Sequence, residues 1–353
     1  AMASHINNYL NNDLIKVKPF DEPAQFSLTA NVEHSPYVSK LLLPQIESYQ
    51  PLAVNLSFDG DSGILFFDAG ISELEINGLH VSGINLKANS DPEYIDFSVR
   101  IPAVYADQLD LTNIAVTGEL KQNNLVFDFS FDDGDELGWL GLSGNLVLQN
   151  GVTEISLMPE LLVNRRMWQV PPDNYFLFGN GIVKAHQLMI TSDEKAIYLS
   201  SGDDKEGTHQ PLEVGLQNID LGSIDLIGDG PIVEGLFNGH LVFMDVFSRP
   251  AFTADLAIDG LGFRGDKIGD IRLLVDNQEA NLFNVDASVS GFGNVVDVHG
   301  IYRQDDPPFL DMDVTLEQLD LSTLEALAFE ELSDMEGLIR GRLHQWRSIR
   351  TRS

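Results

Sequence analysis

Apolar and polar residues alternate along most of the chain. Residues 283–290 read FNVDASVS, in which every second residue is apolar. The same pattern recurs at 26–32, 52–58, 125–131, 252–258 and 310–316. A period of two is that of a β-strand, whose successive side chains point to opposite faces of a sheet. The pattern therefore predicts many strands, each with one wet face and one dry face.

Short turn signals separate the alternating segments, among them DGDSG at 59–63, LQNG at 148–151 and RQDDPP at 303–308. Turn signals at intervals of roughly 8 to 12 residues are typical of an antiparallel meander. The predicted fold class is all-β, and the dry faces must be hidden from water in some way. One possibility is β-sandwich domains, which the pattern alone favours because most alternating sheets pack on a second sheet. The other is a long curled antiparallel sheet, a repeating β-groove, whose inner face forms an apolar trough.

Only two short helices are expected. The segment 36–50 has apolar residues spaced for one helical face but contains Pro44. The segment 322–332, STLEALAFEEL, begins with Ser322 and Glu325, which have the spacing of a capping box. Trp168, in MWQVPPDN, is interpreted as a loop aromatic at the end of the sheet.

One phrase occurs twice. VEGLFNGHL at 233–241 and MEGLIRGRL at 335–343 share five of nine residues at a separation of 102 positions, and each follows an Asp-Leu phrase, at 219–221 and 319–321. This self-similarity predicts a repeated unit of strands. The organisation we expect is a cloning remnant at 1–4, a first groove segment at 5–215, a second unit at 216–330, and the start of another unit at 331–353. Positions 340–353 carry five of the 21 basic residues, unlike the rest of the chain, and one interpretation of this stretch is vector-derived or frame-shifted sequence.

Composition excludes several functions. The formal net charge is −33, so a nucleic acid, which is itself a polyanion, would be repelled. Cysteine is absent, which removes thiolate catalysis and thiolate metal sites. The chain contains no apolar run of about 18 residues, the length that a transmembrane helix requires.

No motif in the chain indicates catalysis. The eight histidines are scattered and form no HExxH pattern, and no GxSxG or phosphate-binding loop is present. Asp132, Asp133 and Asp135, in FDDGDELG, are weak candidates for a calcium site, since oxygen ligands suit that ion. Acidic hairpin turns are common, however, so the expectation is no metal, no cofactor and no enzymatic activity.

The segment 319–343, LDLSTLEALAFEELSDMEGLIRGRL, and its echo at 219–241 resemble the repeated phrase of TamB-like proteins of the wider AsmA-like group. The text between them is similar to that family too, and the resemblance is clearest from about 155 to 343. It implies a periplasmic bridge protein, anchored in the inner membrane by an N-terminal helix and folded as a long β-groove. It further implies transport of phospholipids towards the outer membrane, and assembly of outer-membrane proteins with a BamA-family barrel through regions absent here.

If the apolar alternation lines a groove, the expected partners are phospholipid acyl chains, each methylene contributing about 0.8 kcal/mol on burial. The candidate lipid-contacting residues are Phe127, Phe129, Leu256, Ile258, Phe283, Val285, Val296, Val298, Met312 and Val314. A shift of one residue in strand register would turn this whole set to the other face. The alternative hypothesis is a structural or adhesive β-repeat protein with closed cores.

Overall fold

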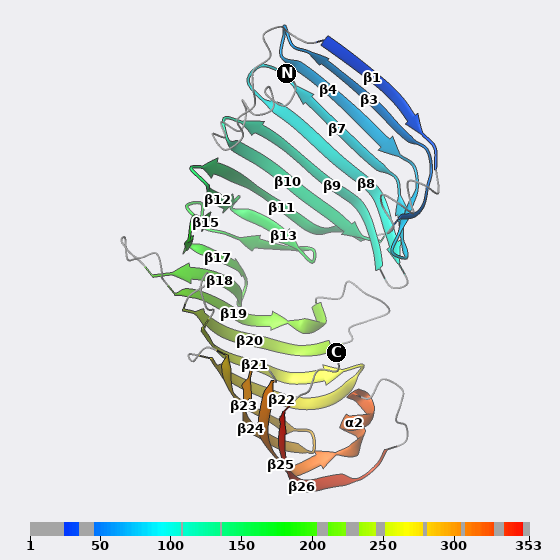
Figure 1. The fold of residues 1–353 in the computed structure, drawn as a ribbon. Coiled ribbons are helices and arrows are strands. Elements are labelled where there is room, and N and C mark those ends of the chain that lie inside the picture. The colour runs from blue at the N-terminus through cyan, green and yellow to red at the C-terminus, as the bar shows by residue number, and fades with distance from the viewer. Residues whose placement is uncertain are drawn as a thin grey trace. The chain divides into compact units, whose positions relative to one another are not determined.

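The computed structural model describes the greater part of the chain. The residues described are 25–34, 46–106, 109–134, 136–202, 211–223, 233–244, 251–277, 281–304, 308–327 and 335–348. Their strands belong to one long antiparallel sheet of 26 strands, with almost no helix (Figure 1). The predicted all-β class and the long antiparallel sheet are thus confirmed. The described strands form no second sheet, as the alternative of β-sandwich domains would require.

The chain divides into two compact units, one ending at Asn180 and the other beginning at Gly181. We call them unit 1 and unit 2. Within each unit the sheet is neither closed nor strongly curled, so the strong curl expected of a groove is not seen. The strands of unit 1 are β1 (Gln25–Val32), β2 (Ile46–Tyr49), β3 (Leu52–Asp59), β4 (Ile64–Ile71), β5 (Leu74–Ile76), β6 (Leu79–Ser82), β7 (Ile84–Ser90), β8 (Ile95–Ala106), β9 (Leu109–Lys121), β10 (Asn124–Asp133), β11 (Glu136–Gln149), β12 (Val152–Leu157), β13 (Glu160–Val163), β14 (Arg166–Gln169) and β15 (Tyr175–Gly179).

Unit 1 is an antiparallel meander in which some pairings skip short strands: β1 pairs with β3, β4 with β7 and β12 with β15. Several of its long strands are divided by an irregularity into two shorter ones. Both β6 and β7 pair with β8, and Gly83, at φ +83°, lies between them. A positive φ is the conformation that glycine adopts without strain. Gly83 therefore lets the chain change direction between β6 and β7 while both strands stay paired with β8.

Unit 2 continues the same up-and-down plan. Its elements are β16 (Ile182–His186), β17 (Leu188–Ser192), β18 (Lys195–Ser201), β19 (Leu212–Asp220), the 3₁₀ helix η2 (Leu221–Ser223), β20 (Val233–Phe243), β21 (Phe252–Phe263), β22 (Asp266–Asp276), β23 (Leu282–Gly291), β24 (Asn294–Arg303), β25 (Phe309–Asp320), α2 (Leu321–Leu327) and β26 (Leu338–Ser348). From β18 to β26 every strand is antiparallel to the next.

The two copies of the repeated phrase occupy equivalent places in unit 2. The first lies in β20, after β19 and η2, and the second runs into β26, after β25 and α2. The registers match: Leu216 pairs with Gly239 as Leu316 pairs with Gly341, and both ladders then shift before residues 219 and 319. The sequence repeat is therefore a structural repeat. The domain boundaries expected at 215 and 330 stay a prediction.

The helix predictions were partly wrong. Of the segment 36–50, residues 36–45 lie outside the described residues, and 46–49 form strand β2. The second helix is present as α2, and it begins at Leu321, one residue before Ser322. Asp320 caps it: its Oδ1 atom accepts hydrogen bonds from the Ser322 amide, at 3.0 Å, and from the Ser322 hydroxyl. The capping box of Ser322 and Glu325 stays a prediction. Glu325 accepts from the Met335 amide and so secures the chain beyond the helix.

Fully buried side chains are few and lie in local clusters. In unit 1 one such cluster lies at the β13–β14 hairpin, where Leu161 and Trp168 face each other across the ladder and Val170 follows. Trp168 is thus a buried strand residue and not the loop aromatic that the sequence suggested. The side chains of Asn174, in unit 1, and Asn294, in unit 2, are almost completely buried.

Candidate functional site

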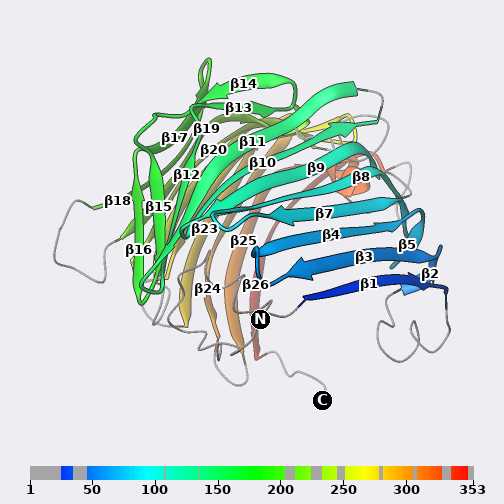
Figure 2. The same cartoon turned by 90° about the horizontal axis from the view of Figure 1, so that it is seen from above.

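Strand register gathers the apolar residues of unit 1 on one face of its sheet. Phe26, on β1, pairs with Phe58, on β3, which pairs with Leu65, on β4. Farther along, Phe97 pairs with Gly118, and Gly118 with Phe127. Directly paired residues of an antiparallel sheet share a face. The resulting surface, which we call the apolar face of unit 1, runs from β1 through β3, β4 and β7–β12 to β15, strands that lie side by side in Figure 2.

Most of this face is only partly shielded from water. On β10 the apolar-face residues, Phe127 and Phe129 among them, are half-buried, whereas Asp128 and Ser130 on the other face are exposed. At the β1 end Phe26 and Leu28 keep 42% and 49% of their surface accessible. Among the described elements of unit 1, strands pack against their ladder neighbours and not against a second layer. The dry face therefore lacks a protein partner over the part of the chain that the structure describes.

Glycines make room for the aromatic rings on this face. A Cβ atom added to Gly118 would lie 2.7 Å from the ring of Phe97, and one added to Gly144 would lie 3.0 Å from the ring of Phe127. Each ring thus lies over the glycine of a neighbouring strand instead of standing away from the sheet. The rings cover the glycine backbone with hydrocarbon, so the apolar face is not interrupted at the glycines.

Unit 2 carries an apolar face built in the same way. Leu256 pairs with Leu273, and Leu273 with Ala287. At one side of the face an aromatic strip crosses the strands: the ring centroids of Phe243 and Phe252 are 6.0 Å apart, and those of Phe252 and Phe283 are 6.1 Å apart. Tyr302 extends the strip, with its ring 5.7 Å from that of Phe283.

All ten candidate lipid-contacting residues lie on these two faces. Phe127 and Phe129 belong to the apolar face of unit 1. The other eight share the apolar face of unit 2, as the pairs Val289–Val296, Val298–Val314 and Gly300–Met312 place them. All ten are half-buried. Their contact with lipid stays a prediction.

Of the aromatic strip, only Phe283 was among the sequence candidates. Phe252 and Tyr302 have the same parity as the candidates on their own strands, so the alternation that identified Phe283 would have identified these two as well. What the sequence could not show is that the rings of four strands meet, because this depends on the register between strands.

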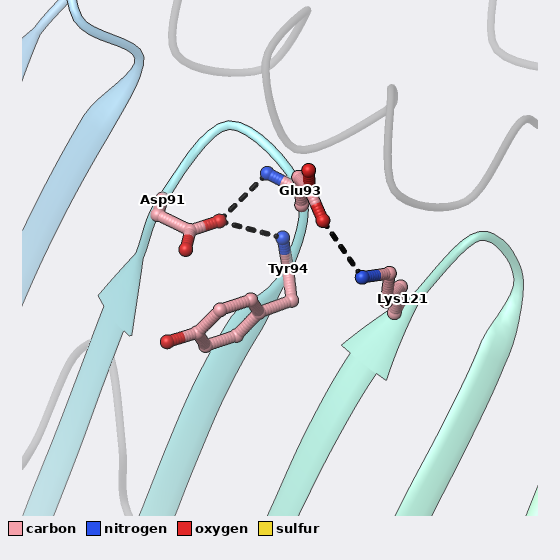
Figure 3. A network of polar contacts seen from close by, with 4 residues as sticks. All are labelled: Asp91, Glu93, Tyr94 and Lys121. Atoms are coloured by element: carbon pink, nitrogen blue, oxygen red, sulfur yellow. Dashed lines mark hydrogen bonds and ion pairs between the residues drawn. The ribbon is translucent and has the colours of Figure 1, made fainter.

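The turns at the ends of the unit 1 strands carry acidic residues, and two basic side chains near them, Lys121 and Arg165, each lie beside a carboxylate. In the turn after β7, Asp91 accepts hydrogen bonds from the amides of Glu93 and Tyr94 (Figure 3). Glu93 in turn binds the Lys121 ammonium, with Nζ and Oε2 2.8 Å apart. The hydrogen bond from Lys121 to Glu93 raises the pKa of the lysine above its ordinary value. At the opposite ends of the strands, Arg165 lies 4.0 Å from Asp133.

The weak metal candidates do not assemble into a site among the described residues. Asp132 accepts hydrogen bonds from the Asn113 side chain, at 2.8 Å, and from the Gly138 amide, at 2.6 Å. Its carboxylate thus holds the turn together, and Asp133 faces Arg165. Asp135 lies outside the described residues. Within those ranges no three acidic or histidine side chains are placed to hold a metal ion.

Comparisons of the chain with protein-family models, curated proteins and solved structures gave no match. Among the described residues no helix is long and apolar enough to cross a membrane.

Proposed function

We propose that this chain is a non-catalytic segment of a TamB-like periplasmic bridge protein whose apolar faces carry phospholipid acyl chains between membranes. One observation carries the proposal. In unit 1 an apolar face extends in register across ten positions in the ladder, from β1 to β15, and most of its side chains stay half-buried without a second layer over them. Soluble proteins rarely expose contiguous apolar patches larger than a few hundred Å², so a face of this extent indicates a partner that covers it.

An acyl chain suits this surface because it needs neither hydrogen bonds nor a closed pocket. A chain of about 16 carbons gains about 0.8 kcal/mol for each methylene that leaves water. In a bilayer the same methylenes are already out of water, so transfer between the bilayer and the apolar face is close to balanced. A nearly balanced exchange is what a carrier requires, since the lipid must be able to leave as well as enter.

The charged groups at the ends of the strands favour headgroups that stay in solvent. Asp91, Glu93 and Asp133 lie in or beside the turns, and Lys121 and Arg165 each lie near a carboxylate. An anionic headgroup would be repelled there unless salt screens the charge. We therefore expect the hydrocarbon, and not the headgroup, to provide most of the affinity.

The test is photo-crosslinking of the intact chain, produced in a bacterial host and purified without detergent. A photoreactive phenylalanine analogue replaces Phe129 on the apolar face or, as the matched control, its neighbour Asp128 on the polar face. Native mass spectrometry of the unmodified chain measures bound lipid in parallel. The expected result is about one phospholipid or more per chain and crosslinks from position 129 but not from 128.

A folded, lipid-free monomer with no crosslink from either position would contradict the proposal and favour a structural protein with closed cores. Equal crosslinking from both positions would mean non-specific association with lipid. The second role of the family, assembly of outer-membrane proteins with a BamA-family partner, also stays a proposal, and we assign no described residue to it.

A further inference from the structure

Imidazoles and carboxylates alternate in one row across the polar face of unit 2. Register places His240 opposite Asp255, and Asp286 opposite His299. His299 is also opposite Asp313, which in turn faces His344 on β26. Leu274, between Asp255 and Asp286, is the one apolar member. We call this set, from His240 to His344, the polar row.

Contacts within the row connect neighbouring strands. The Nδ1 atom of His299 is hydrogen-bonded to Oδ1 of Asp286, which joins β24 to β23. The Nδ1 atom of His344 lies 2.8 Å from Oδ1 of Asp313, which joins β26 to β25. His240 has a longer contact, 3.8 Å from its Nε2 atom to Glu213 on β19. Each of these three histidines thus meets a carboxylate of an adjacent strand.

The charged groups that face His299 are all acidic. Asp286 faces it from β23, Asp313 and, diagonally, Asp311 from β25, and Asp297 lies on its own strand. The hydrogen bond to Asp286, followed by the charges of Asp286, Asp297 and Asp313, raises the pKa of His299 above its ordinary value. On the other side of β25, His344 faces Asp313 and Asp311, with Arg342 on its own strand.

We propose that the polar row is a proton-responsive seam: uptake of a proton by His299 places a cation among these four carboxylates and tightens the pairing of β23, β24 and β25. When the imidazole is neutral, the carboxylates of adjacent strands repel one another with no cation between them. Like charges close together on adjacent strands destabilise a sheet, and opposite charges stabilise it. The seam lies on the strands that carry Val285, Val298 and Val314 on their other face, but it does not depend on what that face binds.

The direction of the pH effect follows from the raised pKa. The stabilising contribution is complete below the pKa of the unfolded chain, about 6.5 for histidine, and it is lost as the pH rises through the higher pKa of the folded state. The seam is therefore strongest in mildly acidic solution and weakens towards alkaline pH. His299 and Asp286 are both more than half exposed, so the effect is also screened by salt.

The experiment is a histidine titration by NMR on the whole chain, labelled at the imidazole carbons, together with melting curves at several pH values. His299→Gln removes the titrating group and Asp286→Asn removes its main partner. His34→Gln, in unit 1 where the ring lies edge-on to Tyr49 at 5.1 Å, is the control for the loss of an imidazole elsewhere.

In the wild type we expect the His299 signal to titrate above the ordinary midpoint of about 6.5, and in Asp286→Asn we expect that midpoint to fall. The decrease in melting temperature caused by His299→Gln, relative to the wild type, should be largest near about pH 5.5 and become smaller towards about pH 8. A His299 midpoint at or below 6.5, or one that Asp286→Asn leaves unchanged, would overturn the proposal. If a variant folds poorly, hydrogen exchange of the β23–β25 amides is measured in the wild type. The exchange should quicken, relative to intrinsic rates, as the pH rises, and an unchanged ratio would contradict the proposal.

Discussion

The apolar face of unit 1 and the β13–β14 cluster at its end bury their side chains in different ways. On β10, Phe127 and Phe129 have protein on one side only and stay half-buried. In the cluster, Leu161 and Trp168 are surrounded and keep 3% and 8% of their surface exposed. Both regions arise from alternating strands, so alternation decides which residues are apolar but not whether they are covered. The cluster belongs to the stable core of unit 1, whereas no described element packs over the face.

The comparison predicts that the largest loss of stability comes from the cluster. Trp168→Ala removes a buried side chain whose surroundings cannot collapse fully, and we expect the free energy of unfolding to fall by about 3–5 kcal/mol. Denaturant unfolding, followed by the circular dichroism of the strands, measures this loss. Met167→Ala is the matched control, because Met167 is 50% exposed on the same strand and should change stability by less than about 0.5 kcal/mol. Equal effects of the two substitutions would mean that the cluster is not a closed core.

A smaller loss is expected from the buried amide of unit 2. Asn294 donates to the Ile268 carbonyl and to the Thr323 hydroxyl, and its Oδ1 atom accepts from the Asp320 amide at 2.9 Å. Asn294→Ala leaves these groups without a partner, which costs about 1–3 kcal/mol. Thr323→Val removes one of the three bonds and should cost less. Amide exchange at Asp320, which should quicken in Asn294→Ala and not in Thr323→Val, separates this role from a general loss of packing.

The strands and their turns could be predicted from sequence because a period of two is a local property. The alternation at 283–290 and 310–316 gave β23 and β25, and the parity of all ten candidates proved consistent within each unit. The roles of Asn174 and Asn294 could not be predicted, because the partners of a buried amide are distant in sequence. Asn294, for example, bonds to residues 26 and 29 positions away. The second helix begins one residue before Ser322 for a local reason: Asp320, directly before the helix, accepts a hydrogen bond from the Ser322 amide and so caps it.

Nor could the sequence decide between a covered and an uncovered sheet. A strand of a sandwich and a strand of a single layer have the same alternation, since both have one dry face. The difference depends on a second layer, which the pattern of any one strand does not encode. The glycines are a partial indication of the surface of the sheet. Gly118 and Gly144 replace apolar residues in the alternation at positions where the rings of adjacent strands lie against the backbone.

These glycines offer a test of how closely the face is packed. A Cβ atom at Gly144 would lie 2.5 Å from the Ser156 carbonyl oxygen and 3.0 Å from the Phe127 ring, so Gly144→Ala must displace backbone. We expect a loss of about 1–3 kcal/mol in the free energy of unfolding. Gly341→Ala is the control, since nothing lies within 4 Å of its added Cβ atom. If Gly144→Ala is as well tolerated as Gly341→Ala, the Phe127 ring does not lie on the strand as described.

A substitution on the apolar face of unit 1 should cause the smallest loss of stability and the largest loss of bound lipid. Phe129→Ala removes a ring that is only half-buried, so we expect unfolding to become easier by about 1–2 kcal/mol, less than for Trp168→Ala. Val126→Ala, on the same strand but on the polar face and 37% exposed, is the control. The lipid bound per chain, measured by native mass spectrometry, should fall in Phe129→Ala and not in Val126→Ala. A stability loss as large as that of Trp168→Ala, with unchanged lipid, would instead mean that the face is covered by protein and that its residues form a core.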